Sequence, residues 1–264
     1  MGRAVPGRTE TRYRKAVGKM AGILAAAAVL AASPVAGAAA ENGGAFDGEM
    51  NLFAMEDESV PKPPCSTLFV GSSSIRFWFE INEDMHMPLI KRGFGGATIP
   101  DVNRYFNRIV TPYRPSRIVF YAGENDLDAG HSPAQVLADF KAFLDRKSAL
   151  LGDTPVFFVS VKPSPSRWKE IEVQRAFNAL VGNLAKTRSD LVYIDVATPM
   201  LRSGTPDPAM FISDHLHMKR AGYAIWKQVI GQALQEAAVP LAPDCRPTEP
   251  ALPAASGQSQ SLRW

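Results

Sequence analysis

The sequence predicts one α/β domain in which helices cover both faces of a parallel sheet. Between residues 65 and 240, short apolar runs alternate with amphipathic helical patterns. The runs are rich in β-branched and aromatic residues, as is usual for strands buried on both faces. Alternation of strands and helices indicates parallel pairing, because parallel strands need a crossover connection, usually a helix.

Five strands and four helices are expected in order along this segment. The expected strands are residues 68–70, 89–92, 118–121, 156–161 and 191–196, and the expected helices are 100–110, 133–150, 168–187 and 218–238. The helix at 133–150 has the clearest start, with Ser132 as its N-cap and Pro133 at its first position. In a doubly wound domain of this kind, the ligand crevice lies outside the carboxyl ends of the strands.

Composition places the chain among ordinary globular proteins. Its 264 residues are 46% hydrophobic and 21% charged, which excludes collagen-like, coiled-coil and wholly disordered proteins. The formal net charge of +3 comes from the first 40 residues, and the remainder holds 23 basic and 25 acidic residues. That balance gives no electrostatic reason to expect a nucleic-acid partner.

Residues 1–40 have the features of a secretory signal peptide. A basic stretch ends at Lys19, an uncharged alanine-rich run follows, and Pro34 breaks it before the small residues Ala38 and Ala40. This order predicts export, with cleavage after Ala38 or Ala40 and a secreted or periplasmic mature protein. A retained membrane anchor is the alternative, and no later segment is long and apolar enough to span a bilayer.

The expected domain, residues 65–240, is flanked by two segments of different composition. Residues 41–64 are rich in glycine, acidic residues and proline and predict a flexible linker or arm, and residues 241–264 predict a proline-rich disordered tail. Cys65 and Cys245 lie near the two junctions. The start of the first strand and the end of the last helix share one end of such a domain, so we expect a disulfide rather than two free thiols.

Glycine and polar residues follow the expected strands or precede the last helix at four places. These groups are Gly71–Ser74, Gly93–Gly96, Gly123–Asp126 and Asp214–His217. Because the carboxyl ends of parallel strands share one edge, the groups are expected to meet there. A serine, a glycine turn, an asparagine and an Asp-x-x-His pair are the parts that acyl transfer requires.

The serine and histidine suggest nucleophilic catalysis. Ser73 is the candidate nucleophile, with Ser74 as the alternative, and His217 is the candidate base that takes its proton. Asp214 stands three residues before His217, so one turn can bring its carboxylate to the other ring nitrogen.

Three donors are candidates for an oxyanion hole: the backbone N–H groups of Ser73 and Gly96 and the side-chain amide of Asn125. The order serine, aspartate, histidine also occurs in α/β-hydrolases, which place the serine in a Gly-x-Ser-x-Gly elbow. Ser73 has Gly71 two residues before it but Ile75 two residues after it, which argues against that fold.

The four blocks together resemble those of the SGNH hydrolases of the GDSL-like esterase family. Gly71-Ser72-Ser73 matches the family's Gly-Asp-Ser, Gly96 its second-block glycine, Gly123 to Asp126 its Gly-x-Asn-Asp, and Asp214 with His217 its Asp-x-x-His. The resemblance runs from Leu68 to Trp226. It implies a flavodoxin-like, three-layer α/β/α fold with strand order 2-1-3-4-5, and hydrolysis of esters or thioesters without a cofactor. The departure is Ser72, where the family has an aspartate that is not one of its four catalytic positions.

Each candidate also has a purely structural interpretation. Ser73 and Asp214 can be helix caps, the glycines and Asn125 can be turn residues, and His217 can be a surface imidazole. His215 and His217 with Asp214 can instead suggest a metal site, although too few other ligands complete it, so we expect no metal. His86 and His131 are expected at the surface.

The sequence thus favours an exported, metal-independent serine esterase acting on a small-molecule ester or an acylated glycan. The alternatives are a thioesterase or lysophospholipase of the same family, an inactive glycan-binding module, a metallohydrolase and a cytoplasmic acyl-CoA thioesterase. The loop at residues 197–213 is short of bulky apolar residues and rich in turn formers. It is unsuited to cover a long acyl tunnel, so acetyl to butyryl esters are expected to react best.

Overall fold

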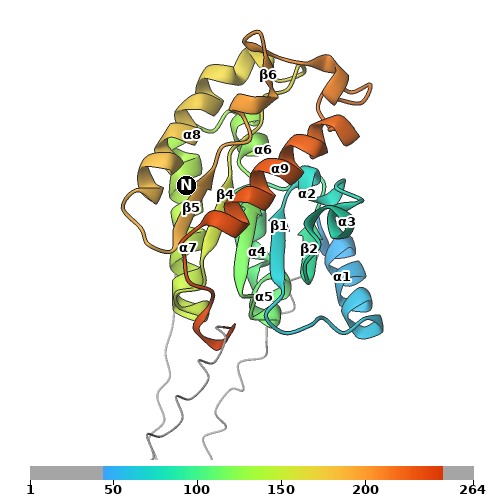
Figure 1. Cartoon of the computed structure of the whole chain (residues 1–264), viewed down its shortest axis with the longest axis vertical. Helices are drawn as coiled ribbons and strands as arrows, with labels where there is room; N and C mark the ends of the chain where they lie inside the picture. Colours follow the sequence, from blue (N-terminus) through green and yellow to red (C-terminus); the bar gives the residue numbers. More distant parts are fainter. Residues whose placement is uncertain (1–43, 246–264) are drawn as a thin grey trace, which may run out of the picture. The chain divides into compact units, whose positions relative to one another are not determined.

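The computed structural model describes residues 44–245, and its centre is a five-stranded sheet (Figure 1). The strands are Thr67–Gly71 (β1), Leu89–Gly93 (β2), Arg117–Tyr121 (β3), Val156–Val159 (β4) and Leu191–Ile194 (β5). They pair in the order β2-β1-β3-β4-β5, and every pairing is parallel. The predicted sheet and its strand order are therefore confirmed.

The four predicted helices are present, two of them altered, and residues 44–245 contain four further α-helices that were not predicted. The α-helices are Asp47–Ser59 (α1), Ser73–Arg76 (α2), Ile81–Met85 (α3), Ile99–Arg104 (α4), Phe106–Ile109 (α5), Glu124–Asp128 (α6), Pro133–Leu151 (α7), Ile171–Ala185 (α8) and Arg220–Glu236 (α9). The expected helix at 100–110 is divided at Tyr105, whose backbone leaves the helical region. The expected helix at 168–187 begins as a short 3-10 turn at Trp168–Glu170.

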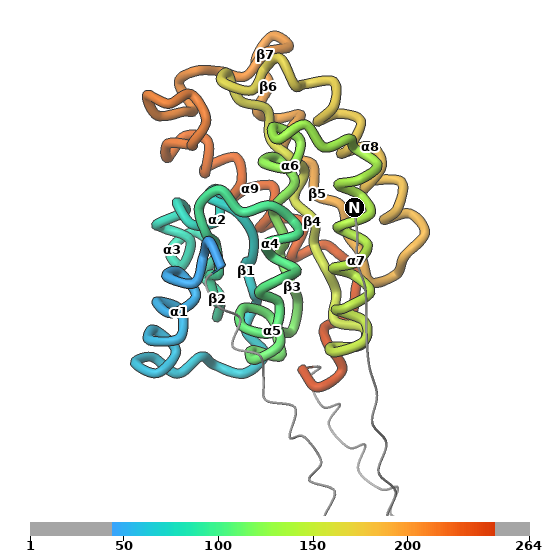
Figure 2. Tube along the Cα trace, turned by 180° about the vertical axis from the view of Figure 1, so that it is seen from behind, coloured from blue at the N-terminus to red at the C-terminus, as the bar shows by residue number. Residues whose placement is uncertain are grey.

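Alternate residues of the strands face two separate cores, which makes the fold three-layered. Leu68 and Val70 of β1 pack with residues of α4, α5, α7 and α8, while Phe69 packs with residues of α2, α3 and α9. Figure 1 shows α9 crossing one face of the sheet, and Figure 2 shows α4, α5, α7 and α8 on the other. The predicted three-layer α/β/α architecture is confirmed.

Strands β4 and β5 end two residues earlier than expected, at Val159 and Ile194. The reason is Ser160, whose side-chain oxygen accepts hydrogen bonds from the backbone N–H groups of Val196 and Ala197. A side chain thus takes the place of the backbone hydrogen bonds between the strands at this point, and both strands end there.

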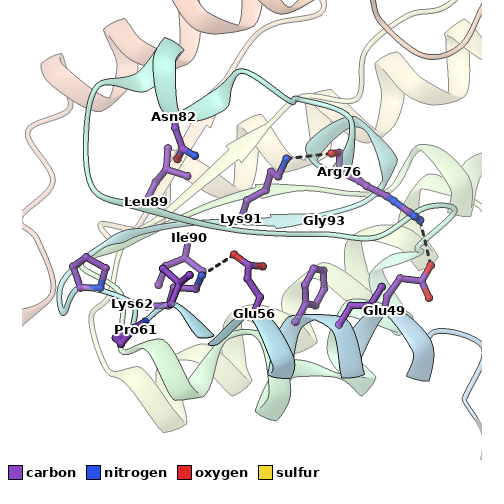
Figure 3. Close-up of a pocket in the computed structure, with 14 residues that line it drawn as sticks. Glu49, Glu56, Pro61, Lys62, Arg76, Asn82, Leu89, Ile90, Lys91 and Gly93 are labelled. Carbon is purple, nitrogen blue, oxygen red and sulfur yellow. Dashed lines mark hydrogen bonds and ion pairs between the residues drawn. The ribbon is translucent and has the colours of Figure 1, made fainter. Parts of the chain in front are cut away.

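In place of the flexible linker or arm expected at residues 41–64, the described part of this segment has a helix, Asp47–Ser59 (α1), which lies along strand β2 (Figure 1). The side chain of Arg92 in β2 is fully buried, and Glu56 and Asp57 of α1 provide its carboxylate partners. Figure 3 shows the neighbouring groove, where Glu56 also pairs with Lys62 and Glu49 pairs with Arg76. The need to neutralise a buried cation explains why this polar segment is docked.

The two cysteines form the predicted disulfide, with 5.4 Å between the Cα atoms of Cys65 and Cys245. Residues 241–245 of the expected tail are described, and Ala242 donates a backbone hydrogen bond to Ser116. The predicted signal peptide and the rest of the tail lie outside the described residues. Within residues 44–245, none of the helices has the length and apolar character needed to cross a membrane.

Candidate active site

The candidate residues lie just beyond the carboxyl ends of neighbouring strands. Gly71 ends β1 with a positive φ of 143°, and a β-carbon there would lie only 1.8 Å from the carbonyl oxygen of Tyr121. Only glycine fits this close approach, and it lets the chain turn sharply into Ser72, the N-cap of α2. Ser73 is therefore the first residue of a short helix at the edge of the sheet.

Ser73, His217 and Asp214 form one hydrogen-bonded line. The Oγ atom of Ser73 lies 3.0 Å from Nε2 of His217, and Nδ1 of His217 lies 2.6 Å from Oδ2 of Asp214. Serine and histidine are 144 residues apart in sequence, so the fold alone brings them together. The line is open to solvent, because the side chains of His217 and Asp214 are 22% and 41% exposed.

Asp214 is held as a carboxylate. Desolvation raises its pKa, but the His217 ring and the backbone N–H groups of Leu216 and His217 donate hydrogen bonds that outweigh this and bring the pKa to about 2. The backbone N–H groups bind Oδ1 of Asp214 and thereby hold Oδ2 against Nδ1 of His217. An ionised, fixed carboxylate at Nδ1 favours the tautomer whose Nε2 can accept a proton from serine.

Asn125 and Asp126 fasten the glycine turn after β2 to helix α6. Asn125 donates its side-chain N–H to the carbonyl oxygen of Ala97 at 2.9 Å, and Asp126 accepts the backbone N–H of Ile99 at 3.0 Å. Gly96 lies in this turn with a φ of 78°, in the left-handed region that glycine permits. The Asn-Asp pair thus positions the turn that carries Gly96.

Asp126 is almost fully buried, and desolvation raises its pKa to about 6 despite the hydrogen bond from Ile99. Its charge state therefore changes within a mildly acidic range, unlike that of Asp214.

A second set of residues supports Asn125, and the sequence alone did not single it out. The Nη2 atom of Arg167 donates hydrogen bonds to Oδ1 of Asn125 and to Oδ2 of Asp128, both at 3.0 Å. In the same set, the buried side chain of Lys162 lies 3.0 Å from Glu124, and desolvation lowers the pKa of that lysine. Arg167 precedes Trp168 in the loop after β4, and its position at the active edge is the one signal that could have suggested a role.

The other serines and histidines occupy different environments. Ser74 is buried, and its carbonyl oxygen accepts a hydrogen bond from the Tyr223 hydroxyl. His86 and His131 are exposed, as expected. Within residues 44–245, no three histidine, cysteine, aspartate or glutamate side chains are grouped as a metal site requires.

Solved structures of several ester hydrolases share this fold. A GDSL-like lipase from Bacteroides thetaiotaomicron is 21% identical, with a TM-score of 0.62, over 70% of this chain and 97% of the other. An acetylxylan esterase from Geobacillus stearothermophilus is 13% identical, with a TM-score of 0.54, over 65% and 95%. A carbohydrate esterase of family 3 from Talaromyces cellulolyticus is 16% identical, with a TM-score of 0.52, over 64% and 96%. The search of curated proteins found no relative by sequence.

The fold, together with a match to a family model, identifies the chain as an ester hydrolase. The model is that of the GDSL-like Lipase/Acylhydrolase family, and it matches residues 76–225, more than half of the chain. The protein belongs to this family. The match begins three residues after Ser73, so the part played by this serine has to be argued from the geometry of the site.

Proposed function

We propose that the protein is an exported serine esterase that hydrolyses carboxylic esters of small acyl groups through an acyl-enzyme intermediate. The observation that carries the proposal is the line from Ser73 Oγ through the His217 ring to Asp214, with contacts of 3.0 and 2.6 Å. A serine hydroxyl needs such a base to act as a nucleophile near neutral pH.

In the first half of the reaction, Ser73 Oγ attacks the ester carbonyl carbon while its proton passes to Nε2 of His217. The tetrahedral intermediate then collapses, the bond to the alcohol oxygen breaks, and His217 returns the proton to that oxygen. In the second half, a water molecule replaces the alcohol, gives its proton to His217 and attacks the acyl-serine. The second tetrahedral intermediate then collapses, the bond from the acyl carbon to Ser73 Oγ breaks, and His217 returns its proton to Oγ, which releases the carboxylic acid and restores the serine hydroxyl.

Asp214 serves as the residue that orients His217 and stabilises its imidazolium form. It remains ionised in this role because the hydrogen bonds that it accepts hold its pKa near 2.

The oxyanion hole is assigned to the backbone N–H groups of Ser73 and Gly96 and the amide of Asn125. The N–H of Ser73 belongs to the first turn of α2, where no intrahelical acceptor exists. Asn125 uses one of its two N–H donors on Ala97, which leaves the other for the oxyanion. These donors are anchored before the reaction starts, which is the condition for strong electrostatic stabilisation.

The preference for small acyl groups rests on the loop at residues 197–213. In the structure this loop contains short 3-10 turns and a two-stranded hairpin, Leu201–Arg202 (β6) with Thr205–Pro206 (β7), tied by bonds to Asp195 and Asp207. Such a compact loop supplies no long apolar lid, so acetyl to butyryl esters should react best. The names of two similar structures, an acetylxylan esterase and a carbohydrate esterase, make O-acetyl groups on extracellular glycans one class of substrate to compare with esters of apolar alcohols.

Export is supported by two independent features. The N-terminal 40 residues have the order of a signal peptide, and the Cys65–Cys245 disulfide suits an oxidising compartment. These features support a secreted or periplasmic location.

Labelling with a serine-directed organophosphonate tests the proposal. We expect modification of Ser73 and loss of activity, and Ser73→Ala should lower kcat by about 10³-fold or more. Ser74→Ala is the matched control and should keep both labelling and activity. Hydrolysis that EDTA abolishes, without any labelling, would indicate a metallohydrolase instead, and absence of both hydrolysis and labelling would indicate a binding module.

A series of p-nitrophenyl esters from C2 to C16, measured above and below the micellar limit, tests the acyl size. We expect the highest rate between C2 and C4. A maximum at C10 or longer, or a jump in rate at the micellar limit, would show a lipase or lysophospholipase, and a parallel thioester series would detect a thioesterase.

A further inference from the structure

A cavity of about 570 Å³ lies beside His217, between the connection from α2 to α3 and the segment that leads into α9. Five of its lining residues present apolar surface: Phe77, Phe79, Ile212, Met218 and Tyr223. The volume lies in the range of pockets that hold a small organic molecule.

The apolar surface of this cavity is unusually accessible. The side chain of Phe79 is 72% exposed and that of Ile212 is 42% exposed. Tyr223 lines the cavity but is almost fully buried, with its hydroxyl bonded to the carbonyl oxygen of Ser74, so the exposed apolar surface comes mainly from Phe79 and Ile212. Large apolar side chains that are exposed together beside a reaction centre indicate a site for an apolar ligand.

The cavity is connected to the candidate active site through His217. The ring of Phe77 meets the His217 ring edge to face, with 4.8 Å between their centroids. Among the described residues, His217 and Asp214 line the cavity, whereas Gly96 and Asn125 do not. The cavity therefore lies on the histidine side of Ser73 and away from the proposed oxyanion hole.

This placement decides which part of an ester reaches the cavity. In the tetrahedral intermediate the oxyanion points to the hole, whereas the alcohol oxygen must lie near Nε2 of His217 to receive its proton. We propose that the cavity binds the alcohol portion of the ester and that this alcohol is apolar, with an aryl or alkyl group held against Phe77 and Phe79. The inference rests on the proposed serine-esterase function.

Two of the charged residues around the cavity already have partners. Arg220 lines it, but both terminal nitrogens of its guanidinium donate to Asp84, and Asp214 is engaged by His217. Glu80 and Lys219 also line the cavity and are able to bond sugar hydroxyl groups, so the choice of an apolar alcohol rests on the aromatic wall of Phe77 and Phe79. The test must therefore include a sugar acetate, so that a preference for a sugar alcohol can be detected.

The test varies each side of the ester separately. Benzyl acetate and methyl acetate differ only in the alcohol, and the two alcohols have closely similar acidity, so a rate difference reports binding rather than leaving ability. We expect wild-type kcat/KM to be about tenfold higher for benzyl acetate, which is the effect of one well-placed apolar contact. Methyl butyrate against methyl acetate measures the acyl side in the same way.

The variant Phe79→Ser shortens a side chain that lines the cavity and is 72% exposed. It should reduce the benzyl-to-methyl preference to about twofold or less and leave the butyrate-to-acetate ratio unchanged. Leu150→Ser is the matched control, since Leu150 is 49% exposed on α7 and does not line this cavity. It should behave as the wild type.

Three results would overturn the inference and still leave an active esterase. The wild type would show no preference for benzyl acetate, or Phe79→Ser would lower the butyrate-to-acetate ratio. The third is a higher wild-type kcat/KM for an O-acetylated methyl glycoside than for benzyl acetate. If the wild type hydrolyses none of these esters and phosphonate does not label Ser73, the proposed function is overturned, and this inference with it.

Discussion

The guanidinium of Arg167 donates a hydrogen bond of 3.0 Å to the side-chain oxygen of Asn125. The opposite end of the same amide donates to the carbonyl oxygen of Ala97 at 2.9 Å. Together the two contacts fix the plane of the amide and determine which side carries its donors. Arg167 is therefore a positioning residue for the proposed oxyanion hole, and it acts through Asn125.

A double-mutant cycle tests this role. Asn125→Ala should lower kcat by about 10²–10³-fold with little change in KM, as loss of an oxyanion donor does. Arg167→Met should lower kcat by about tenfold, because a misaligned amide stabilises the oxyanion less well. In the Asn125→Ala background, Arg167→Met should have no further effect on kcat. Independent, additive losses, or an effect on KM alone, would show that Arg167 does not work through Asn125.

Asp214 and His217 should differ in the size of their contributions. His217→Ala should reduce kcat by about 10³-fold or more, because no base remains to accept the serine proton. Asp214→Asn should cost less, since it keeps the imidazole and removes only its orientation and charge partner. Steady-state kinetics of the two variants provide the comparison, and an equal or larger loss in Asp214→Asn would contradict the assigned roles.

Asp126 should make stability depend on mildly acidic pH. Its pKa is raised by desolvation to about 6 in the folded protein, above the ordinary value of 3.8. Between these values the folded state binds more protons than the unfolded state, so the free energy of unfolding falls as pH rises and is constant above both. The loss from this group between pH 4 and 7 is about 2–3 kcal/mol.

Urea unfolding from pH 4 to 7 measures this effect. Asp126→Asn keeps an oxygen for the Ile99 N–H but cannot ionise, so its free energy of unfolding should fall less than that of the wild type over this range. Parallel pH curves for the two proteins would exclude Asp126 as the source.

Helix α1 should stabilise the domain through Arg92, whose side chain is fully buried. Asp57 accepts from both Arg92 and the hydroxyl of Tyr113. Asp57→Asn should lower the free energy of unfolding by about 2 kcal/mol, because one carboxylate partner of a buried cation is lost. Glu58→Gln, at an exposed position of the same helix, is the control and should change little. Equal stability of the two variants in chemical denaturation would contradict this role of α1.

Loss of the disulfide should destabilise the protein without slowing catalysis. Cys65 and Cys245 are 180 residues apart, and opening so long a loop costs up to about 4 kcal/mol in the chain-entropy model. The double variant Cys65→Ser, Cys245→Ser should unfold at a lower temperature and retain kcat at 25 °C, because both positions lie near the amino end of β1, away from Ser73. An unchanged melting temperature, or two free thiols in wild-type protein from an oxidising compartment, would contradict the prediction.

Strand positions were predictable because their burial leaves a local signature. Four of the five strands are rich in β-branched and aromatic residues, whereas β2, Leu89–Gly93, contains Lys91 and Arg92 and carries a weaker signal. The Ser73, Asn125 and His217 blocks were predictable for a related reason, since each follows or precedes an expected element at an expected spacing. The ends of β4 and β5 were not, because they depend on one side chain, Ser160, that bonds across to the next segment.

Helix α1 and Arg167 escaped prediction because their partners are distant in sequence. Helix α1 buries little apolar surface of its own, with Met50 as its one buried residue, and is docked by ion pairs to Arg92 in β2. Arg167 meets Asn125 from a loop 42 residues later in the chain. Neither contact has a periodic pattern that can be recognised without the fold.

The Cys65–Cys245 disulfide closes a covalent ring that contains the whole sheet. In the sequence, Ser73 follows soon after Cys65, and His217 lies closer to Cys245. The hairpin turn at Ser203 and Gly204 is exposed and lies inside this ring. One proteolytic cut there would produce two polypeptides, one with Ser73 and the other with His217, joined covalently by this disulfide alone. In such a nicked enzyme, the packed core between α9 and the sheet would be the one remaining link between nucleophile and base once a thiol reductant had opened the disulfide.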